Sequence, residues 1–224
     1  SYVMAGDPHP HVTVPLLHRM VEAGVDVIEL GLPFSDPMAD GPVIALAAER
    51  ALAGGTNTLD ALNMVKEFRK NDAATPVVLM GYANPIERIG QAEFIAQAVT
   101  AGVDGALVVD YPPEESADFA TQAKAAGLDI IYLVAPTSTE ARMESTAKVA
   151  SGFIYYVSLK GVTGAGTLDV TDVANNVAKL REFTDLPINV GFGISDATSA
   201  QAVARVADGV VIGSKLITMI ESGE

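Results

Sequence analysis

Residues 101–109 read Ala-Gly-Val-Asp-Gly-Ala-Leu-Val-Val, and they contain the unit from which the fold is predicted. Gly102 suits the left-handed backbone conformation that ends a helix. Residues 105–109 form an almost unbroken apolar run, which is typical of a parallel strand that is covered on both faces. The stretch therefore predicts the end of a helix, a short loop and a buried parallel strand.

The same unit recurs elsewhere in the chain, as Ala23-Gly24-Val25-Asp26 and Ala126-Gly127-Leu128-Asp129. Along the whole length, short β-branched runs are separated by longer stretches with apolar residues three and four apart, so we expect strand and helix to alternate strictly. The expected strands are 2–4, 27–31, 76–80, 105–109, 130–134, 153–157, 188–190 and 210–212. The expected helices are 11–23, 58–70, 91–101, 115–126, 139–150, 172–183 and 195–206.

Eight parallel strands with intervening helices imply an α/β protein with the closed (β/α)8 TIM barrel fold, whose function lies at the carboxyl ends of the strands. An open doubly wound sheet is the alternative. However, no Gly-x-Gly-x-x-Gly turn follows the first strand to favour a dinucleotide site. No linker or low-complexity segment divides the chain, so residues 1–224 are expected to form a single domain.

Composition excludes several classes of function. Fourteen basic and 28 acidic residues give a net charge of −14, which disfavours nucleic acid and anionic membrane surfaces as partners. The absence of cysteine excludes disulfides, thiol catalysis and thiolate metal sites. The longest stretch without Asp, Glu, Lys or Arg, 73–86, is too short to span a membrane. No secretory-signal pattern is present at either end, so we expect a cytoplasmic protein.

Glu29 is the first candidate for chemistry. It lies within the apolar strand 27–31, where loss of hydration would raise the pKa of its carboxyl toward the range that suits general acid–base catalysis. The alternative is a glutamate at a strand end that reaches solvent or a structural partner.

The loop 33–42 follows this strand, is long for a strand-to-helix connection and carries Asp36 and Asp40. Structural alternatives exist for both carboxylates. Asp36 before Pro37 is typical of a turn, and Asp40 could cap a helix whose first turn contains Pro42.

Glycines gather after the last three strands, at 161–166, at 191–193 around Phe192, and at Gly213 before Ser214. Glycine lets backbone N–H groups approach a phosphate closely, and helices that begin at Ser195 and Ser214 would add their dipoles. The loops after strands seven and eight are the frequent phosphate site of this barrel. Neutral backbone donors would therefore let an acidic chain bind a phosphate.

Other polar residues at strand ends leave more than one interpretation open. Tyr82, Asp110 and Tyr155 could contact a ligand, but a tyrosine is equally typical of amphipathic core filling. The histidines are confined to positions 9, 11 and 18, so no metal is predicted. Lys160 is the plausible lysine for a Schiff base, with a solvated loop lysine as its alternative.

Residues 29–42, Glu-Leu-Gly-Leu-Pro-Phe-Ser-Asp-Pro-Met-Ala-Asp-Gly-Pro, resemble the signature of the tryptophan synthase alpha subunit family. Further motifs of the family follow the other strands in order, so the resemblance covers essentially the whole chain. They lie at 5–8, 80–85, 110–112, 135–137, 158–164 and 191–194.

The resemblance implies retro-aldol cleavage of indole-3-glycerol phosphate to indole and glyceraldehyde 3-phosphate in tryptophan biosynthesis, without metal, cofactor or covalent intermediate. It implies that Glu29 protonates indole C3 and takes the glycerol hydroxyl proton, and that Asp40 binds the indole N–H. It makes Tyr155 the active-site tyrosine and Thr163 part of a loop that closes against the Asp40 loop. The remaining substrate contacts implied are Tyr82 and Asp110 in the pocket and Gly164, Phe192, Gly193, Gly213 and Ser214 at the phosphate.

The family also implies a partner, the beta subunit with its pyridoxal phosphate (PLP), in an alpha-beta-beta-alpha heterotetramer. A stand-alone indole-releasing lyase and a catalytically silent phosphate-binding regulatory barrel are the alternatives, and the presence of both Glu29 and Asp40 disfavours the silent form. The chain departs from the family at Met4, where threonine is expected, and at Tyr2, where the aromatic residue is often Phe. The family's terminal helices are expected to be short or missing.

Overall fold

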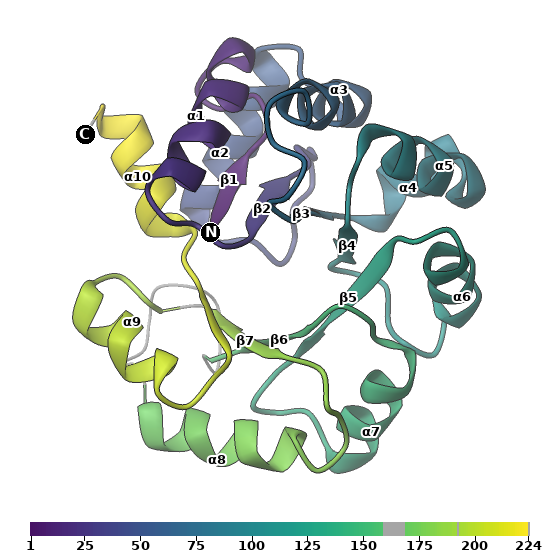
Figure 1. Ribbon diagram of the computed structural model, residues 1–224, viewed down its shortest axis with the longest axis vertical. Coiled ribbons are helices and arrows are strands. Elements are labelled where there is room, and N and C mark those ends of the chain that lie inside the picture. The colour runs from purple at the N-terminus through teal and green to yellow at the C-terminus, as the bar shows by residue number, and fades with distance from the viewer. Residues whose placement is uncertain (159–168, 192, 224) are drawn as a thin grey trace.

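The computed structural model describes residues 1–158, 169–191 and 193–223, and these form a barrel of parallel strands inside a ring of helices (Figure 1). Each strand pairs in parallel with the next along the chain, in the order β1 to β8, which confirms the barrel prediction. The strands are β1 (Tyr2–Met4), β2 (Ile28–Gly31), β3 (Val77–Gly81), β4 (Gly105–Val108), β5 (Asp129–Val134), β6 (Ile154–Val157), β7 (Ile188–Gly191) and β8 (Gly209–Val211).

A backbone hydrogen bond joins the last strand region to the first. The N–H of Tyr2 donates to the carbonyl of Ile212 over 2.9 Å, directly after the end of β8. The barrel thereby closes between its first and last strands, so residues from both ends of the chain can line one site.

Helices follow every strand, but the predicted strict alternation is wrong at two places. Two helices follow β2 and two follow β3. Proline is well tolerated in the first turn of a helix. Pro42 is the first residue of α2, a helix that the sequence suggested only through the capping alternative for Asp40, and Pro85 lies in the first turn of α4, where no helix was predicted. The helices are α1 (Pro10–Glu22), α2 (Pro42–Ala53), α3 (Thr58–Phe68), α4 (Ala83–Ile89), α5 (Gln91–Ala101), α6 (Ala117–Ala125), α7 (Glu140–Val149), α8 (Val170–Leu180), α9 (Ala197–Ala204) and α10 (Ser214–Ser222).

The three repeated glycines end helices as predicted. Gly24, Gly102 and Gly127 have φ angles of +96°, +85° and +87°, which L side chains rarely adopt. Each glycine stands directly before the short loop that leads into β2, β4 or β5. The repeated Ala-Gly-x-Asp unit therefore marks three of the turns that lead from a helix into a strand of the barrel.

The apolar residues form three packed groups. The largest lies between the strands and the surrounding helices, and a second fills the barrel interior around Val78, Leu107, Ile131 and Tyr155. The third joins β1, α2 and α10, and its buried members are Tyr2, Met4, Ile44, Ala47, Ala48, Ala51 and Ile217. This third group fixes α2 and α10 beside the first strand.

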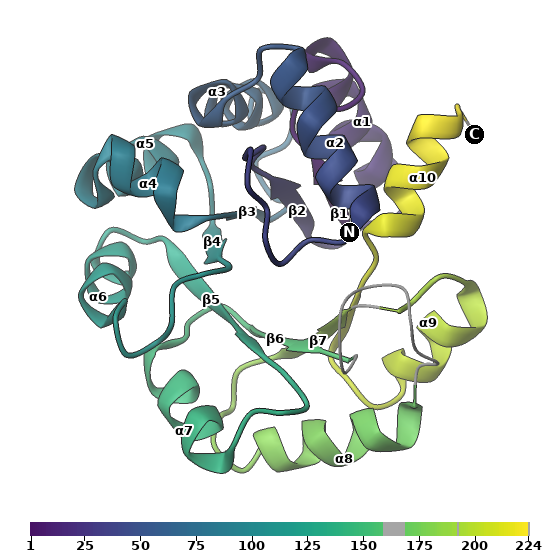
Figure 2. The same ribbon diagram turned by 180° about the vertical axis from the view of Figure 1, so that it is seen from behind.

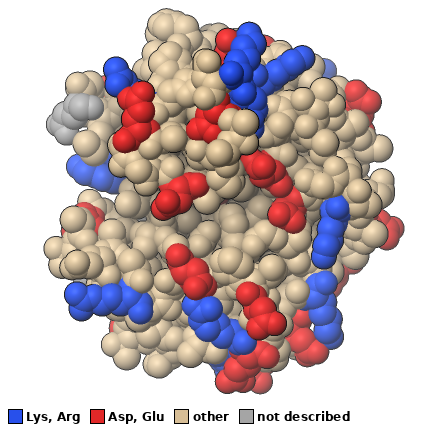
Figure 3. All heavy atoms as spheres, in the orientation of Figure 1, with Lys and Arg blue, Asp and Glu red and all other residues tan. Residues whose placement is uncertain are grey.

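Acidic side chains dominate the charged surface. On the face that Figure 3 shows, Asp and Glu side chains surround a central hollow and most Lys and Arg side chains lie farther out. Within the described ranges, every helix is too short or too polar to cross a membrane.

Candidate active site

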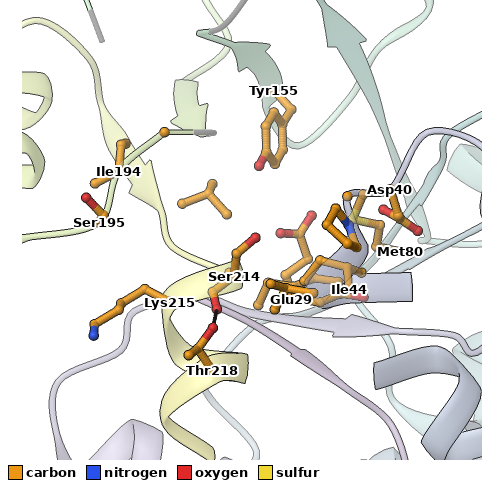
Figure 4. A pocket seen from close by; sticks show the side chains of 17 residues that line it. Glu29, Asp40, Ile44, Met80, Tyr155, Ile194, Ser195, Ser214, Lys215 and Thr218 are labelled. Atoms are coloured by element: carbon orange, nitrogen blue, oxygen red, sulfur yellow. Dashed lines mark hydrogen bonds between the residues drawn. The ribbon is translucent and has the colours of Figure 1, made fainter. Parts of the chain in front are cut away.

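A pocket of about 450 Å³ lies inside the barrel, between the strands and the start of α10 (Figure 4). Six of the predicted site residues line it: Glu29, Asp40, Tyr155, Gly193, Gly213 and Ser214. They come from β2, the loop before α2, β6, the segment after β7 and the end of β8 with α10. The closed barrel thus brings together residues that are up to 185 positions apart, from 29 to 214.

Glu29 is buried in the barrel interior, with 4% of its surface exposed. Its Oε1 atom has no hydrogen-bond partner among the residues that the structure describes. Burial raises the pKa of the Glu29 carboxyl to about 7, and the nearby Asp40 carboxylate contributes to the rise. The alternative of a solvent-exposed Glu29 is therefore wrong, and the carboxyl can both give and take a proton near neutral pH.

Asp40 lies at the pocket wall, where Tyr82 holds its carboxylate. The Tyr82 hydroxyl donates to Oδ2 of Asp40 over 3.0 Å and accepts the Ala39 N–H over 3.1 Å. Burial raises the pKa of Asp40, and the hydrogen bond from Tyr82 lowers it in part. The N-cap of α2 is Gly41, with no side-chain cap, so the capping alternative for Asp40 is wrong.

The neighbouring Asp36 carboxylate, by contrast, is exposed and accepts the Ser35 hydroxyl over 2.6 Å. The backbone N–H of Met38 donates to the Asp36 carbonyl over 2.8 Å, as in the turn alternative for this residue. The two carboxylates of the loop are thereby separated, and Asp40 is the one that lines the pocket.

Two buried tyrosines enter the barrel interior where glycines of the next strand leave room. A Cβ atom built on Gly191 would lie 2.1 Å from the Tyr155 hydroxyl oxygen, and one on Gly31 would lie 2.2 Å from that of Tyr2. Tyr155 reaches into the same space as Glu29 (Figure 4), and its pKa is raised well above the ordinary value by burial first and by Glu29 second. The phenol therefore stays protonated at neutral pH.

The segment after β7 and the start of α10 form the glycine-rich end of the pocket. Gly193 has a φ angle of +72°, and Gly213 is the N-cap of α10. The first N–H groups of a helix have no partner within the helix and favour an anion. The predicted helix start at Ser195 is wrong, because Asp196 accepts the Ser199 N–H over 2.7 Å and α9 begins at Ala197.

The other predicted residues lie outside this pocket or outside the described residues. Tyr82 lies behind Asp40, and the Asp110 carboxylate accepts the N–H of Ala83 at the start of α4 over 2.7 Å. Thr163, Gly164 and Phe192, as well as Lys160, lie outside the described residues.

Sequence reasoning missed several lining residues, namely Ile44, Met80, Lys215 and Thr218. Ile44 and Met80 carry no chemical signal in the sequence, whereas Lys215 and Thr218 could have been found by extending a helix from Ser214. Among the described residues, no group of three or more His, Asp or Glu side chains could hold a metal ion.

Comparison with known proteins gives one consistent result. A family model described as "Tryptophan synthase alpha chain" matches residues 1–224. The tryptophan synthase alpha chain of Acinetobacter baumannii (strain ATCC 17978) is 66% identical over 217 residues, which cover 97% of this chain and 81% of that protein. That of Acinetobacter baylyi is 68% identical with the same coverage.

Solved structures agree with these relatives. Tryptophan synthase subunit alpha from Legionella pneumophila superposes with a TM-score of 0.90 at 45% identity, covering 100% of this chain and 84% of that one. A chain of the tryptophan synthase complex from Pyrococcus furiosus gives a TM-score of 0.88 at 36% identity, covering 99% and 88% of the two chains.

Proposed function

The chain belongs to the tryptophan synthase alpha chain family, and we propose that the pocket around Glu29, Asp40 and Tyr155 performs its reaction. Membership makes the protein a carbon–carbon lyase that cleaves indole-3-glycerol phosphate in tryptophan biosynthesis. The products of this retro-aldol cleavage are indole and glyceraldehyde 3-phosphate. The observation that carries the assignment of the site is the buried Glu29 carboxyl, with its pKa near 7, beside Asp40 and Tyr155 in one pocket.

Glu29 acts as the general acid and base of the proposed mechanism. It protonates indole C3, which makes the ring a leaving group, and it takes the proton of the glycerol hydroxyl as that carbon becomes the aldehyde. The bond between indole C3 and the glycerol carbon breaks, and its electron pair goes to the ring. A group with a pKa near the working pH is suited to both transfers.

Asp40 and Tyr155 support the ring as charge develops on it. The Asp40 carboxylate accepts the indole N–H, whose acidity rises when C3 is protonated. Tyr82 keeps that carboxylate in place through the 3.0 Å hydrogen bond. Tyr155, which stays neutral, offers a hydroxyl to the substrate side of Glu29.

The glycine-rich end of the pocket binds the phosphate. Gly193, Gly213 and Ser214 line it, and the start of α10 supplies unpaired backbone N–H groups. The resemblance adds Gly164 and Phe192 to these contacts and places Thr163 on a loop that closes against the Asp40 loop. This closure would exclude water from the reaction. The resemblance also implies Tyr82 and Asp110 as substrate contacts, but neither lines this pocket, and in this proposal Tyr82 acts through Asp40.

We further propose that a beta subunit is the partner of this chain. One solved relative is the tryptophan synthase a2b2 complex from Pyrococcus furiosus. Met38, in the Asp40 loop at the barrel rim, is 80% exposed and offers an apolar contact there. In this proposal the partner carries PLP, the alpha chain carries no cofactor of its own, and the assembly is an alpha-beta-beta-alpha heterotetramer in the cytoplasm.

The test is indole release from indole-3-glycerol phosphate, measured with and without a beta subunit. Release that depends on Glu29 and rises with the partner supports the proposal. Equal release in both conditions would favour a stand-alone lyase, whereas binding of the substrate without any indole release would favour a regulatory barrel.

A further inference from the structure

Arg50 joins three segments that lie far apart in the sequence. It stands in the last turn of α2, and its Nε and Nη2 donate to the two carboxylate oxygens of Asp7 over 2.7 and 3.0 Å. Its Nη1 donates to Oε1 of Glu221 in α10 over 3.0 Å. One guanidinium therefore connects the loop after β1, the helix after the Asp40 loop, and the helix at the phosphate end of the pocket.

The Asp7 side of this link is buried and fixed. The Asp7 side chain is 1% exposed, and Arg50 binds both of its oxygens in the parallel two-point geometry that a guanidinium favours. The hydrogen bond to Asp7 is the main reason why the pKa of Arg50 is raised. Arg50 is thus held in one place and can act as a fixed point for its second partner, Glu221.

The Glu221 side is what ties α10 to that fixed point. Within α10, Ile217 is the buried residue, and it packs against the small core that β1 and α2 share. Both views of the chain show α10 alongside α2 on the outside of the barrel (Figures 1 and 2). The Arg50–Glu221 pair is therefore a second attachment, about one helical turn beyond Ile217.

The opposite ends of these two helices border the pocket. Pro42 and Ile44 at the start of α2 line it, as do Gly213 and Ser214 at the start of α10. Arg50 is eight residues from Pro42, or about 12 Å along the helix, so it acts at a distance from the substrate.

We propose that Arg50 is a positioning residue for the cleavage reaction: by holding α2 against α10, it sets the separation between the Asp40 segment and the phosphate-binding start of α10. This role rests on the proposed function of the pocket. It concerns binding of the phosphate end more than the proton transfers, because the start of α10 carries two of the proposed phosphate contacts, Gly213 and Ser214, whereas Glu29 belongs to β2.

Variants of Glu221 test the role without leaving a buried charge unpaired. Glu221→Ala removes the α10 attachment and leaves the Arg50–Asp7 pair intact. We expect it to raise the KM for indole-3-glycerol phosphate and the inhibition constant of inorganic phosphate about two- to fivefold, the range for one partly exposed ion pair. The dissociation constant of indole and kcat should stay within about twofold.

Glu221→Gln keeps a neutral acceptor for Arg50 and should restore most of the phosphate affinity. Glu144→Ala is the matched control, since it breaks the exposed 2.8 Å Glu144–Lys148 pair on α7, away from the pocket. If Glu221→Ala matched this control in KM and phosphate inhibition, or lost indole and phosphate affinity in equal proportion, the positioning role would be wrong.

Gly213→Ala separates this failure from that of the proposed site. If Gly213→Ala weakens phosphate inhibition and Glu221→Ala does not, the assignment of the phosphate site is supported and the positioning role of Arg50 is wrong. If Gly213→Ala leaves phosphate inhibition unchanged, the start of α10 does not bind the phosphate, and the role of Arg50 is overturned together with the phosphate contacts proposed for Gly213 and Ser214.

Discussion

Replacing Glu29 by glutamine is expected to stabilise the folded protein above neutral pH while it lowers turnover by at least about 10²-fold. The buried carboxyl has a pKa of about 7 in the folded chain, against an ordinary value of 4.5. Between these values the unfolded chain has lost the proton and the folded chain keeps it. This group's contribution to the free energy of unfolding is thus complete below pH 4.5 and falls as the pH rises through about 7.

The size of the effect follows from the two pKa values. Each pH unit between them corresponds to about 1.4 kcal/mol, so ionising Glu29 costs the wild-type fold about 3 kcal/mol at pH 8. Glutamine has a similar shape and does not titrate. The variant should therefore match the wild type near pH 4.5 and exceed its free energy of unfolding by about 3 kcal/mol at pH 8.

Urea unfolding of both proteins at pH 5 and at pH 8, followed by circular dichroism, measures this difference. Glu144→Gln is the control, because it makes the same chemical change at an exposed side chain on α7. The same pH dependence in the wild type and in Glu29→Gln would refute the assignment of the buried, protonated carboxyl to Glu29.

Four further substitutions test the remaining parts of the site. Asp40→Asn should reduce kcat, and its melting temperature should stay close to that of the wild type because Gly41 and not Asp40 is the N-cap of α2. A loss of about 1 kcal/mol in the free energy of unfolding together with full activity would instead support a capping role for Asp40. Tyr82→Phe removes the hydrogen bond that holds Asp40 and should lower kcat about fivefold, the effect of one net hydrogen bond, and an unchanged kcat would show that Asp40 needs no such support. Gly213→Ala should raise the KM for indole-3-glycerol phosphate more than the dissociation constant of indole. The negative φ angle of Gly213 admits a side chain, but the added methyl group crowds the backbone N–H groups at the start of α10. Equal losses of affinity for both ligands would indicate misfolding. Lys160→Ala should keep turnover within about tenfold, and trapping of substrate on Lys160 by borohydride would contradict the non-covalent mechanism.

Much of the fold could be predicted because local sequence encodes it. Gly102 and its two counterparts end helices through their positive φ angles, and the apolar runs after them are the strands. The helix that contains Pro85 was missed, and the one that begins at Pro42 was considered only as the capping alternative for Asp40, since a proline in a first turn is indistinguishable in sequence from one in a loop. Ser195 was mistaken for a helix start because the neighbouring Asp196 is the stronger cap.

The site could be predicted where the local sequence around a single residue indicates its chemistry. Glu29 was identified because a carboxylate inside an apolar strand must lose hydration, and the structure places it there. The partners of such residues were not predictable, since Tyr82 reaches Asp40 across 42 positions and Arg50 reaches Glu221 across 171. Those contacts depend on how the barrel closes, which no local pattern specifies.

Tyr2 and Tyr155 occupy the space that a side chain on Gly31 or Gly191 would need. The effect of a substitution at either glycine therefore depends strongly on the residue at its paired tyrosine position. In each pair, Tyr2 with Gly31 and Tyr155 with Gly191, the phenol from one strand fills space beside the glycine of the next strand. A methyl group on either glycine collides with a phenol, and a smaller residue in place of either tyrosine loses buried contacts beside the pocket. A side chain on either glycine therefore requires a smaller residue in place of its tyrosine, so a lineage that added one there would pass through an unfavourable intermediate. Design for a different ring system should exchange both members of a pair together.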